Sequence, residues 1–230
     1  MKCIGVLGGM SWESTALYYR LMNEETKAAL GGLHSARIVM HSVDFHDIET
    51  LQHSDDWDGA GAILCEAAVG LKRAGADFLV IATNTMHKLA DRIEKTANLP
   101  LLHIAEPTGA ALVANSVKRV ALLGTRFTME EDFYRSYLER RFALDILVPE
   151  ADDRAVIHRI IYEELCRGVV TEASRVVFAQ CIGRLKRAGA EAVILGCTEI
   201  TMVVDPSTSP LPAYDTTALH AKAAVGRALA

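Results

Sequence analysis

The feature that most constrains the fold of this chain is an internal repeat. Residues 71–76, LKRAGA, recur letter for letter at residues 185–190, which lie 114 positions later. Residues 2–8 also resemble residues 118–124 at an offset of 116, nearly the same shift. Two separate segments that repeat at one spacing favour a duplicated unit over shared local chemistry. We therefore expect two pseudo-symmetric domains; the alternative is one continuous sheet whose strands merely share composition.

Both halves alternate short β-branched runs with longer amphipathic stretches, which is the rhythm of βαβ units. This rhythm predicts the α/β class, with a doubly wound parallel sheet in each domain. Strands are expected over residues 3–8, 37–44, 78–83, 120–124, 145–150 and 192–197, and helices over residues 12–30, 58–74, 129–141, 153–167 and 172–188.

The boundary between the halves should lie near residues 100–107, a segment with a proline at each end. The stretch after Pro212 is predicted to form a helix that returns to pack on the first domain. We therefore assign residues 1–103 and 212–230 to the first α/β domain and residues 104–211 to the second.

Composition narrows the class of partner. The chain has 230 residues, half of them hydrophobic, and a formal net charge of −5 with interspersed signs. Because there is no basic patch, a small molecule is the expected partner, rather than nucleic acid or a membrane surface. The apolar N-terminal run is too short for a secretory signal or a membrane span, which predicts a cytoplasmic protein. The five cysteines have neither disulfide nor zinc spacing, so reduced thiols and no metal are expected.

When the 114-residue offset is continued through the strand that follows each hexapeptide, Thr83 aligns with Cys197. Both residues lie at the carboxyl end of a predicted strand, where open parallel sheets bind ligands. Two such domains facing each other would present these side chains from opposite sides of an interdomain cleft. Inversion of a carbon centre by two bases needs this geometry, because one group removes a proton from one face while the other supplies a proton to the opposite face. The plain alternative for Cys197 is an inert thiol that packs at a strand end.

The residues that follow Thr83 and Cys197 open the next predicted helices, through Asn84-Thr85 and Thr198-Glu199. Free N–H groups at a helix N-terminus suit a carboxylate, and the helix dipole would lower the pKa of Cys197. His87 is the only histidine expected near this site.

Polar turns also follow the first strand, at Met10 and Ser11, and its duplicate, at Thr125. The glycines before Met10 do not form the GxGxxG pattern of dinucleotide-binding folds, so NAD is not expected, and no other cofactor is indicated.

At this point the motifs resemble the aspartate/glutamate racemase family over essentially the whole chain. They are residues 8–15 (GGMSWEST), 42–45 (SVDF), 84–87 (NTMH), 124–129 (GTRFTM) and 196–200 (GCTEI). The resemblance implies a pyridoxal-independent amino-acid racemase with two similar α/β domains, an interdomain site, no cofactor and a homodimeric assembly.

The resemblance also implies roles for individual residues. A cysteine should end the third strand of each half, and the two should act as opposing acid and base; Cys197 matches the second, whereas Thr83 replaces the first. Arg167 matches a basic residue that pairs with the substrate's side-chain carboxylate. Gln52 lies where some aspartate-specific relatives have arginine, which opens the site to neutral amino acids. The residues implied to bind the α-carboxylate and amine, or to face the substrate from the first turn, are Asn84, Thr85, Thr198, Met10 and Ser11.

These roles predict that Cys197 removes the α-proton and that Thr83, or a water it holds, reprotonates the other face. The resemblance implies that the second-half cysteine serves the L-enantiomer. Because an alcohol is a poor base, aspartate or glutamate should therefore react faster as the L-enantiomer. Two alternatives stay open: an isomerase or decarboxylase of small dicarboxylates that uses one cysteine, and a non-catalytic protein that binds a dicarboxylate or amino acid.

Overall fold

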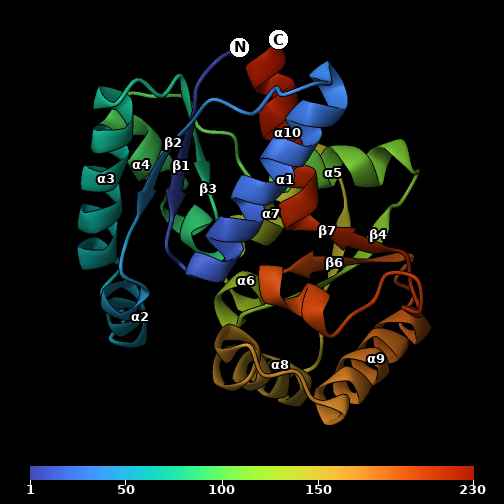
Figure 1. Ribbon diagram of the computed structural model, residues 1–230. Coiled ribbons are helices and arrows are strands. Elements are labelled where there is room, and N and C mark those ends of the chain that lie inside the picture. Colours follow the sequence, from blue (N-terminus) through green and yellow to red (C-terminus); the bar gives the residue numbers. More distant parts are fainter. The chain divides into compact units, whose positions relative to one another are not determined.

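The computed structural model describes residues 1–230 and divides them into two compact units (Figure 1). The first comprises residues 1–104 and 220–230, and the second residues 105–219. Each unit has its own parallel sheet with helices on both faces, as the α/β assignment predicts. No helix here combines the length and the hydrophobicity that a membrane crossing requires.

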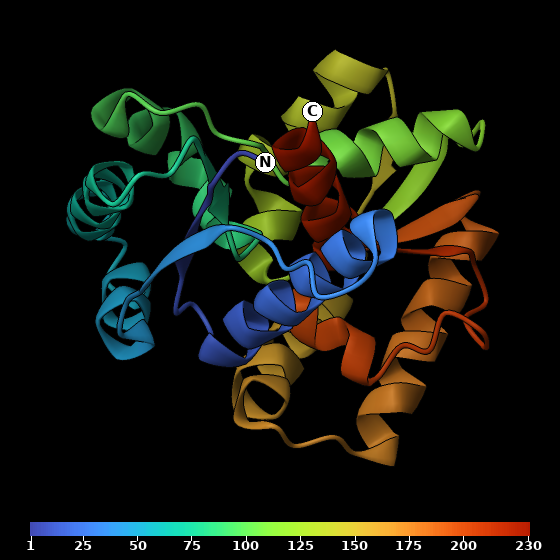
Figure 2. The ribbon, with the colours of Figure 1, turned by 45° about the horizontal axis from the view of Figure 1, so that its top comes forward.

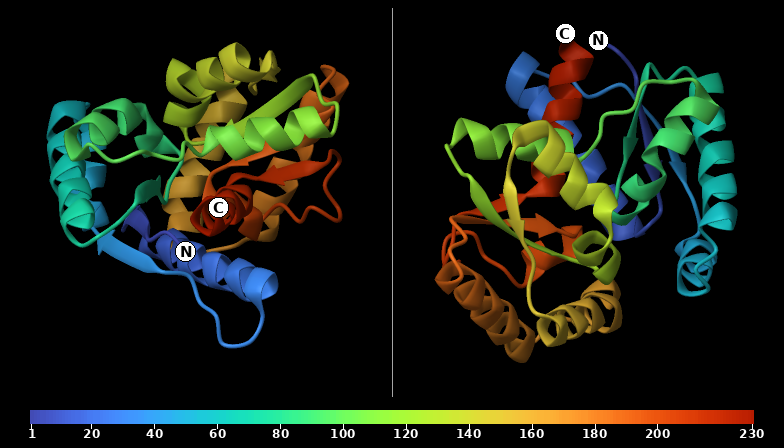
Figure 3. Two further views of the ribbon diagram at one scale, coloured as in Figure 1. Left: turned by 90° about the horizontal axis from the view of Figure 1, so that it is seen from above. Right: turned by 180° about the vertical axis from the view of Figure 1, so that it is seen from behind.

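The first unit is built on three parallel strands in the order β2-β1-β3. They are β1 (Ile4–Gly8), β2 (Ile38–Ser42) and β3 (Phe78–Ile81). Two helices cover one face through a core around Tyr18 and Met22, namely α1 (Trp12–Leu30) and α10 (Thr216–Leu229) (Figure 2). The two termini lie side by side in this unit, where the Lys2 amide donates to the Ala228 carbonyl at 2.8 Å (Figure 3).

The opposite face of this sheet packs on a second apolar core. It is covered by α2 (Phe45–His53), α3 (Trp57–Arg73), the 3₁₀ turn η1 (Thr85–Leu89) and α4 (Ala90–Ala97). The sequence predicts α3 and a helix that opens at Asn84-Thr85, which is the turn η1 followed by the 8 residues of α4, but it does not predict α2, which is 9 residues long. Helices of two turns give too few apolar repeats for a 3.6-residue period to stand out.

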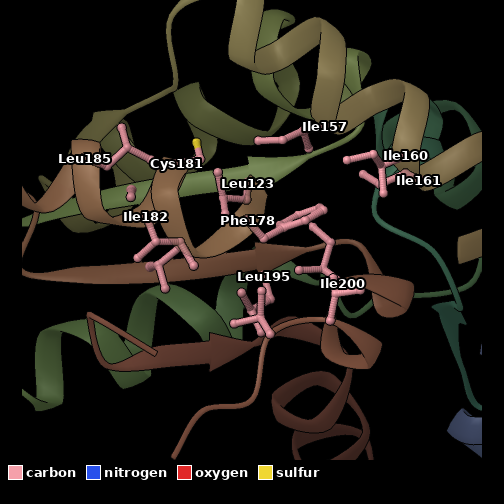
Figure 4. Packing of buried hydrophobic residues seen from close by; sticks show 14 of the residues in the cluster. Leu123, Ile157, Ile160, Ile161, Phe178, Cys181, Ile182, Leu185, Leu195 and Ile200 are labelled. Carbon is pink, nitrogen blue, oxygen red and sulfur yellow. The ribbon is translucent and has the colours of Figure 1, made fainter. Parts of the chain in front are cut away.

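The second unit has four parallel strands in the order β5-β4-β6-β7. They are β4 (Arg119–Gly124), β5 (Asp145–Leu147), β6 (Ala192–Gly196) and β7 (Ala213–Asp215). On one face α8 (Ala151–Glu163) and α9 (Glu172–Arg187) close a core around Phe178 and Leu195 (Figure 4). The other face carries α5 (Ala105–Ala114) and α7 (Asp132–Phe142), which pack together (Figure 3).

The repeated hexapeptide makes the same helix end twice. Ala74 and Ala188 have nearly equal backbone angles, φ −79° with ψ 0° and φ −77° with ψ 0°. Gly75 and Gly189 follow with φ of 94° and 100°, a conformation that side chains other than glycine disfavour. The strand orders β2-β1-β3 and β5-β4-β6 also correspond. The expectation of two similar α/β units is therefore confirmed.

Three expected boundaries need correction. The helix expected over residues 129–141 is two helices, α6 (Arg126–Glu130) and α7, because Glu131 between them is extended at φ −87° and ψ 153°. The helix expected over residues 153–167 ends at Glu163, before the 3₁₀ turn η2 (Leu165–Arg167). The chain joins the first unit at residue 220 rather than 212, because β7 pairs with β6 in the second sheet.

Candidate active site

The carboxyl end of β3 carries Thr83 and the start of η1. Thr83 is half-buried, and the Asn84 and Thr85 side chains behind it are buried. The Thr83 carbonyl accepts a hydrogen bond from Nδ1 of His87 at 2.8 Å, and the preceding Ala82 carbonyl accepts one from the Ser14 hydroxyl at 3.0 Å. The backbone on both sides of the Thr83 hydroxyl is therefore held in place.

The turn after β1 lies beside it, because β1 and β3 are neighbours in the sheet. Gly9 has φ 91°, and a Cβ there would lie 2.1 Å from the Val43 carbonyl oxygen, so only glycine fits. The Gly9 amide donates to the Thr15 hydroxyl at 2.8 Å, and that hydroxyl donates to the Ser11 carbonyl at 2.8 Å. Met10 and Ser11 are joined by a cis peptide bond and are buried.

The corresponding edge of the second sheet carries Cys197, directly after β6. Its side chain is partly buried, and Sγ donates to Oε2 of Glu199 at 2.9 Å. Burial raises the pKa of Cys197 well above its ordinary value, and the adjacent Glu199 carboxylate raises this pKa further. The expectation of a lowered pKa is wrong, because η3 (Thr198–Met202) is a 3₁₀ turn of 5 residues that cannot offset burial beside a carboxylate.

Three hydroxyls surround the Cys197 turn. The Thr217 hydroxyl donates to the Thr198 hydroxyl at 3.3 Å, and the Thr216 hydroxyl donates to the Leu195 carbonyl at 2.9 Å. Directly after the neighbouring strand β4, Thr125 is the buried N-cap of α6 and accepts from the Thr128 amide at 3.3 Å. The edge of each sheet thus presents small polar groups, of the kind that bind a carboxylate or an amine.

A comparison of sequences decides the family. The pattern of the Asp/Glu/Hydantoin racemase family matches residues 7–224 of this chain. The chain belongs to this family. It is an isomerase of the amino-acid racemase class, as the resemblance of its motifs implies.

Individual relatives of this racemase-family chain agree with the assignment. A broad-specificity amino-acid racemase of Bacillus subtilis (strain 168) is 24% identical over 99% of this chain and 98% of its own length. A crystal structure from Yersinia pestis assigned to the Asp/Glu racemases is 49% identical, with a TM-score of 0.94 over 100% of both chains. An aspartate racemase homologue from Pyrococcus horikoshii OT3 is 30% identical, with a TM-score of 0.84 over 100% of both chains.

The structure brings the predicted site residues of the racemase together in two groups, one in each unit. In the first unit they lie past the ends of neighbouring β1 and β3: Met10, Ser11, Thr83, Asn84 and Thr85. In the second unit they lie past the ends of neighbouring β4 and β6: Thr125, Cys197 and Thr198. The pairing of Thr83 with Cys197 across a common substrate joins different units and stays a prediction.

Gln52 and Arg167 are placed differently from these groups. Gln52 is buried in α2, which begins directly after β2 at the same edge of the first sheet, and its Oε1 oxygen has no hydrogen-bond partner. Arg167 is exposed at the end of η2, a turn that packs against η3. The structure therefore leaves the Gln52 amide oxygen as an available acceptor, whereas Arg167 lies on the surface beside the Cys197 turn.

Sequence reasoning did not assign functional roles to Glu199, Asp215 and Thr217. Glu199 was only the second residue of an expected helix, although its position two residues after the cysteine was a usable signal. Asp215 accepts from the Thr217 amide at 2.8 Å, and burial raises the pKa of this carboxyl. Asp215 ends β7 and Thr217 follows it, and this strand of 3 residues is too short for a periodic pattern to reveal. No group of three or more His, Cys, Asp or Glu side chains is positioned to hold a metal ion.

Proposed function

We propose that this chain racemises aspartate or glutamate at the α-carbon without pyridoxal phosphate, with Cys197 as the main base and Thr83 as a weak opposite partner. The observation that carries the proposal is the Cys197–Glu199 contact at 2.9 Å, at the end of the strand that duplicates the one before Thr83. A thiol with a carboxylate at hydrogen-bond distance has an immediate partner for its proton. An inert structural thiol needs no such neighbour.

In the forward step, the Cys197 thiolate takes the α-proton of the L-enantiomer and becomes a thiol, leaving an electron pair on the α-carbon. The Thr83 hydroxyl gives its proton to the opposite face, and a water returns a proton to the Thr83 oxygen. The product is the D-enantiomer, and the sulfur passes its extra proton to solvent through Glu199. A hydroxyl can serve here because it is both a donor and an acceptor.

The reverse step requires Thr83 to remove a proton from the D-enantiomer. A threonine hydroxyl is not ionised near neutral pH, whereas the Cys197 thiol, despite its raised pKa, has the Glu199 carboxylate at 2.9 Å to take its proton. The equilibrium constant between enantiomers is one, so the asymmetry appears only in rates. We therefore expect the D-enantiomer to react much more slowly than the L-enantiomer.

The substrate contacts in this proposal are polar groups at the two sheet edges. Asn84, Thr85 and Thr198 would bind the α-carboxylate and amine, with Met10, Ser11 and Thr125 beside them. The unpartnered Oε1 of Gln52 would accept a hydrogen bond from a substrate donor, and Arg167 would pair with a side-chain carboxylate. Gln52 cannot supply charge, which suits a wider range of amino acids than an arginine would.

The test is α-hydrogen exchange in deuterium oxide without added cofactor, using both enantiomers of aspartate and glutamate. Deuterium should enter the L-forms faster, and Cys197→Ala should abolish the exchange. The mechanism fails if the two enantiomers exchange at equal rates. A matched control is Cys181→Ala, which removes a thiol buried in the core of the second unit.

A second candidate function is favoured because only one of the two equivalent residues, Cys197, carries a thiol. The chain could act on a small dicarboxylate as a one-cysteine isomerase or decarboxylase, or bind an amino acid without turnover. Loss of CO₂ from a malonate-type substrate would identify the decarboxylase. Binding of L-aspartate by calorimetry with no exchange of its α-hydrogen would identify the binding protein.

The family resemblance also leads us to propose a homodimer. Sedimentation equilibrium should then give twice the mass of the 25.0 kDa chain at micromolar concentration. A single species of monomer mass would contradict the dimer without bearing on the chemistry.

A further inference from the structure

The chain passes between its two units twice, after residue 104 and before residue 220. Each passage is held on the side of the first unit by a buried histidine. His87 bonds to Ile104, the last residue before the first passage, and His220 is the first residue after the second passage. Their side chains are 3% and 0% exposed, so their hydrogen bonds are shielded from water.

The two bonds of the His87 ring fix its protonation state. Nδ1 lies 2.8 Å from the Thr83 carbonyl oxygen, which can only accept, so Nδ1 carries the hydrogen. Nε2 lies 3.1 Å from the Ile104 amide, which can only donate, so Nε2 is bare. The ring is thus neutral, with its proton on Nδ1, and this one tautomer makes both bonds at once.

The surroundings of His87 favour the neutral ring. The His103 ring lies 4.6 Å from it and the His220 ring 5.8 Å, measured between centroids. His220 in turn donates from Nε2 to the Leu102 carbonyl at 2.8 Å and accepts at Nδ1 from the Tyr18 hydroxyl at 2.8 Å. Burial and the two neighbouring histidines hold the pKa of His87 well below its ordinary value.

We propose that His87 is a positioning residue, which ties the Thr83 peptide to the segment that connects the two units and so sets where the Thr83 hydroxyl lies. This inference rests on the proposed role of Thr83 in reprotonation. The carbonyl that His87 holds belongs to the same residue as that hydroxyl, so the loss of this bond frees the hydroxyl to shift. A displacement of about 1 Å at a reacting group can cost on the order of a hundredfold in rate.

The second unit replaces this tie with a local contact. The position equivalent to His87 in the repeat is Thr201, whose hydroxyl donates to the Thr198 carbonyl at 2.8 Å within its own turn. Cys197 is supported by Glu199 beside it, whereas Thr83 is supported through an imidazole that reaches the connecting segment. Thr83, the weaker proton donor and acceptor of the proposed pair, is therefore the one held through a contact distant in the sequence.

Two substitutions separate the two bonds of His87. His87→Asn puts an amide N–H near the position of Nδ1 and keeps the donor to Thr83. His87→Gln puts an amide oxygen near the position of Nε2 and keeps the acceptor for Ile104. The control is His220→Gln, in the same buried cluster, because His220 bonds to Leu102 and Tyr18 rather than to Thr83.

The measurement is the ratio of two rates on the L-substrate, namely deuterium entry into the L-form and formation of the D-form. Deuterium entry can occur through Cys197 alone, whereas D-product also needs Thr83. In His87→Gln we expect deuterium entry to fall less than about threefold and D-product to fall more than about tenfold. His87→Asn should recover most of the wild-type ratio, and His220→Gln should leave the ratio unchanged.

A parallel fall of both rates in His87→Gln would overturn the positioning role, since general damage to the fold would not change the ratio. Nitrogen-15 NMR of the wild-type imidazole provides a test that needs no variant to fold. A proton on Nδ1 of His87 is expected, and a proton on Nε2 instead would also overturn the inference. Failure of the proposed function is distinct, because the wild-type protein would then neither exchange nor racemise these amino acids.

Discussion

At the scale of single residues, the neighbours of Cys197 set its acidity. Burial and the Glu199 carboxylate both favour the protonated thiol. Such a cysteine is mostly the protonated thiol at neutral pH, and it becomes a base only after its proton has moved to the carboxylate or the positive charge of a bound ammonium group has lowered its pKa. The turn that follows Cys197 is too short to act as the helix dipole that the sequence suggested.

The first prediction concerns the pH dependence of α-proton exchange from the L-substrate. Because the pKa of Cys197 is raised, kcat/KM should keep increasing with pH above neutrality. Glu199→Gln removes the negative charge that raises this pKa, so the rising limb should move to lower pH. Glu172→Gln removes a like charge from an exposed position and should not move it. If the rising limb of kcat/KM lies at the same pH in Glu199→Gln as in the wild type, the electrostatic role of Glu199 is refuted.

The second prediction concerns Thr83. Thr83→Cys supplies an ionisable group on the face where the D-enantiomer must lose its proton. The rate of racemisation starting from D-aspartate or D-glutamate should rise by on the order of a hundredfold or more, since a positioned general base contributes about 10²- to 10⁴-fold. Thr83→Ser, which keeps an alcohol, is the control and should show no such rise. A Thr83→Cys variant that folds and binds substrate but gains nothing from the D-side would contradict the two-face mechanism.

At the scale of elements, the ends of α3 and α9 show how a repeated sequence builds a repeated helix-to-strand connection. Both helices stop at an alanine followed by glycine with positive φ, after which the chain enters β3 or β6. The helix end determines where the strand begins, and the strand determines where Thr83 or Cys197 emerges. The equivalence of these two residues is therefore built into the backbone.

The third prediction follows from these glycines. Gly75→Ala and Gly189→Ala should each lower the free energy of unfolding by about 1–2 kcal/mol, because both positions have φ near 100°. Gly226→Ala in α10 is the control, since its added Cβ meets open space and its φ is negative. That substitution should raise stability by up to about 1 kcal/mol. Urea unfolding measures all three, and a neutral result at Gly75 and Gly189 would mean that the repeated cap is not needed.

At the scale of the whole molecule, buried neutral histidines make stability depend on pH. Burial lowers the pKa of His220 to about 4 from an ordinary value of 6.5, and the pKa of His87 is lowered as well. Between pH 4 and pH 6.5, His220 is therefore protonated in the unfolded chain but largely neutral in the folded chain, so the unfolded chain binds more protons. The contribution of His220 is therefore complete above about pH 6.5 and is lost as the pH falls toward 4.

The fourth prediction states the size of this effect. The free energy of unfolding should decrease by about 3 kcal/mol between pH 7 and pH 4 through His220 alone, since one pH unit corresponds to 1.36 kcal/mol. His220→Gln should be less stable than wild type at pH 7 and should lose stability less steeply on acidification. Denaturant titrations at several pH values measure both quantities. Equal slopes for the two proteins would show that His220 is not the group responsible.

The sequence by itself determined the class of fold, the duplication and the equivalence of Thr83 with Cys197, because hydrophobic periodicity and helix-stop residues act over a few neighbours. It also placed the substrate-binding candidates at strand ends. Only the tertiary structure decided the assignment of β7 to the second sheet, the raised pKa of Cys197 and the His87 bridge between Thr83 and Ile104. Each of these depends on burial or on a partner brought near by folding, and neither is encoded by local sequence. The unequal pairing of Thr83 with Cys197 could be predicted from the sequence, whereas the imidazole contact that holds the Thr83 peptide could not.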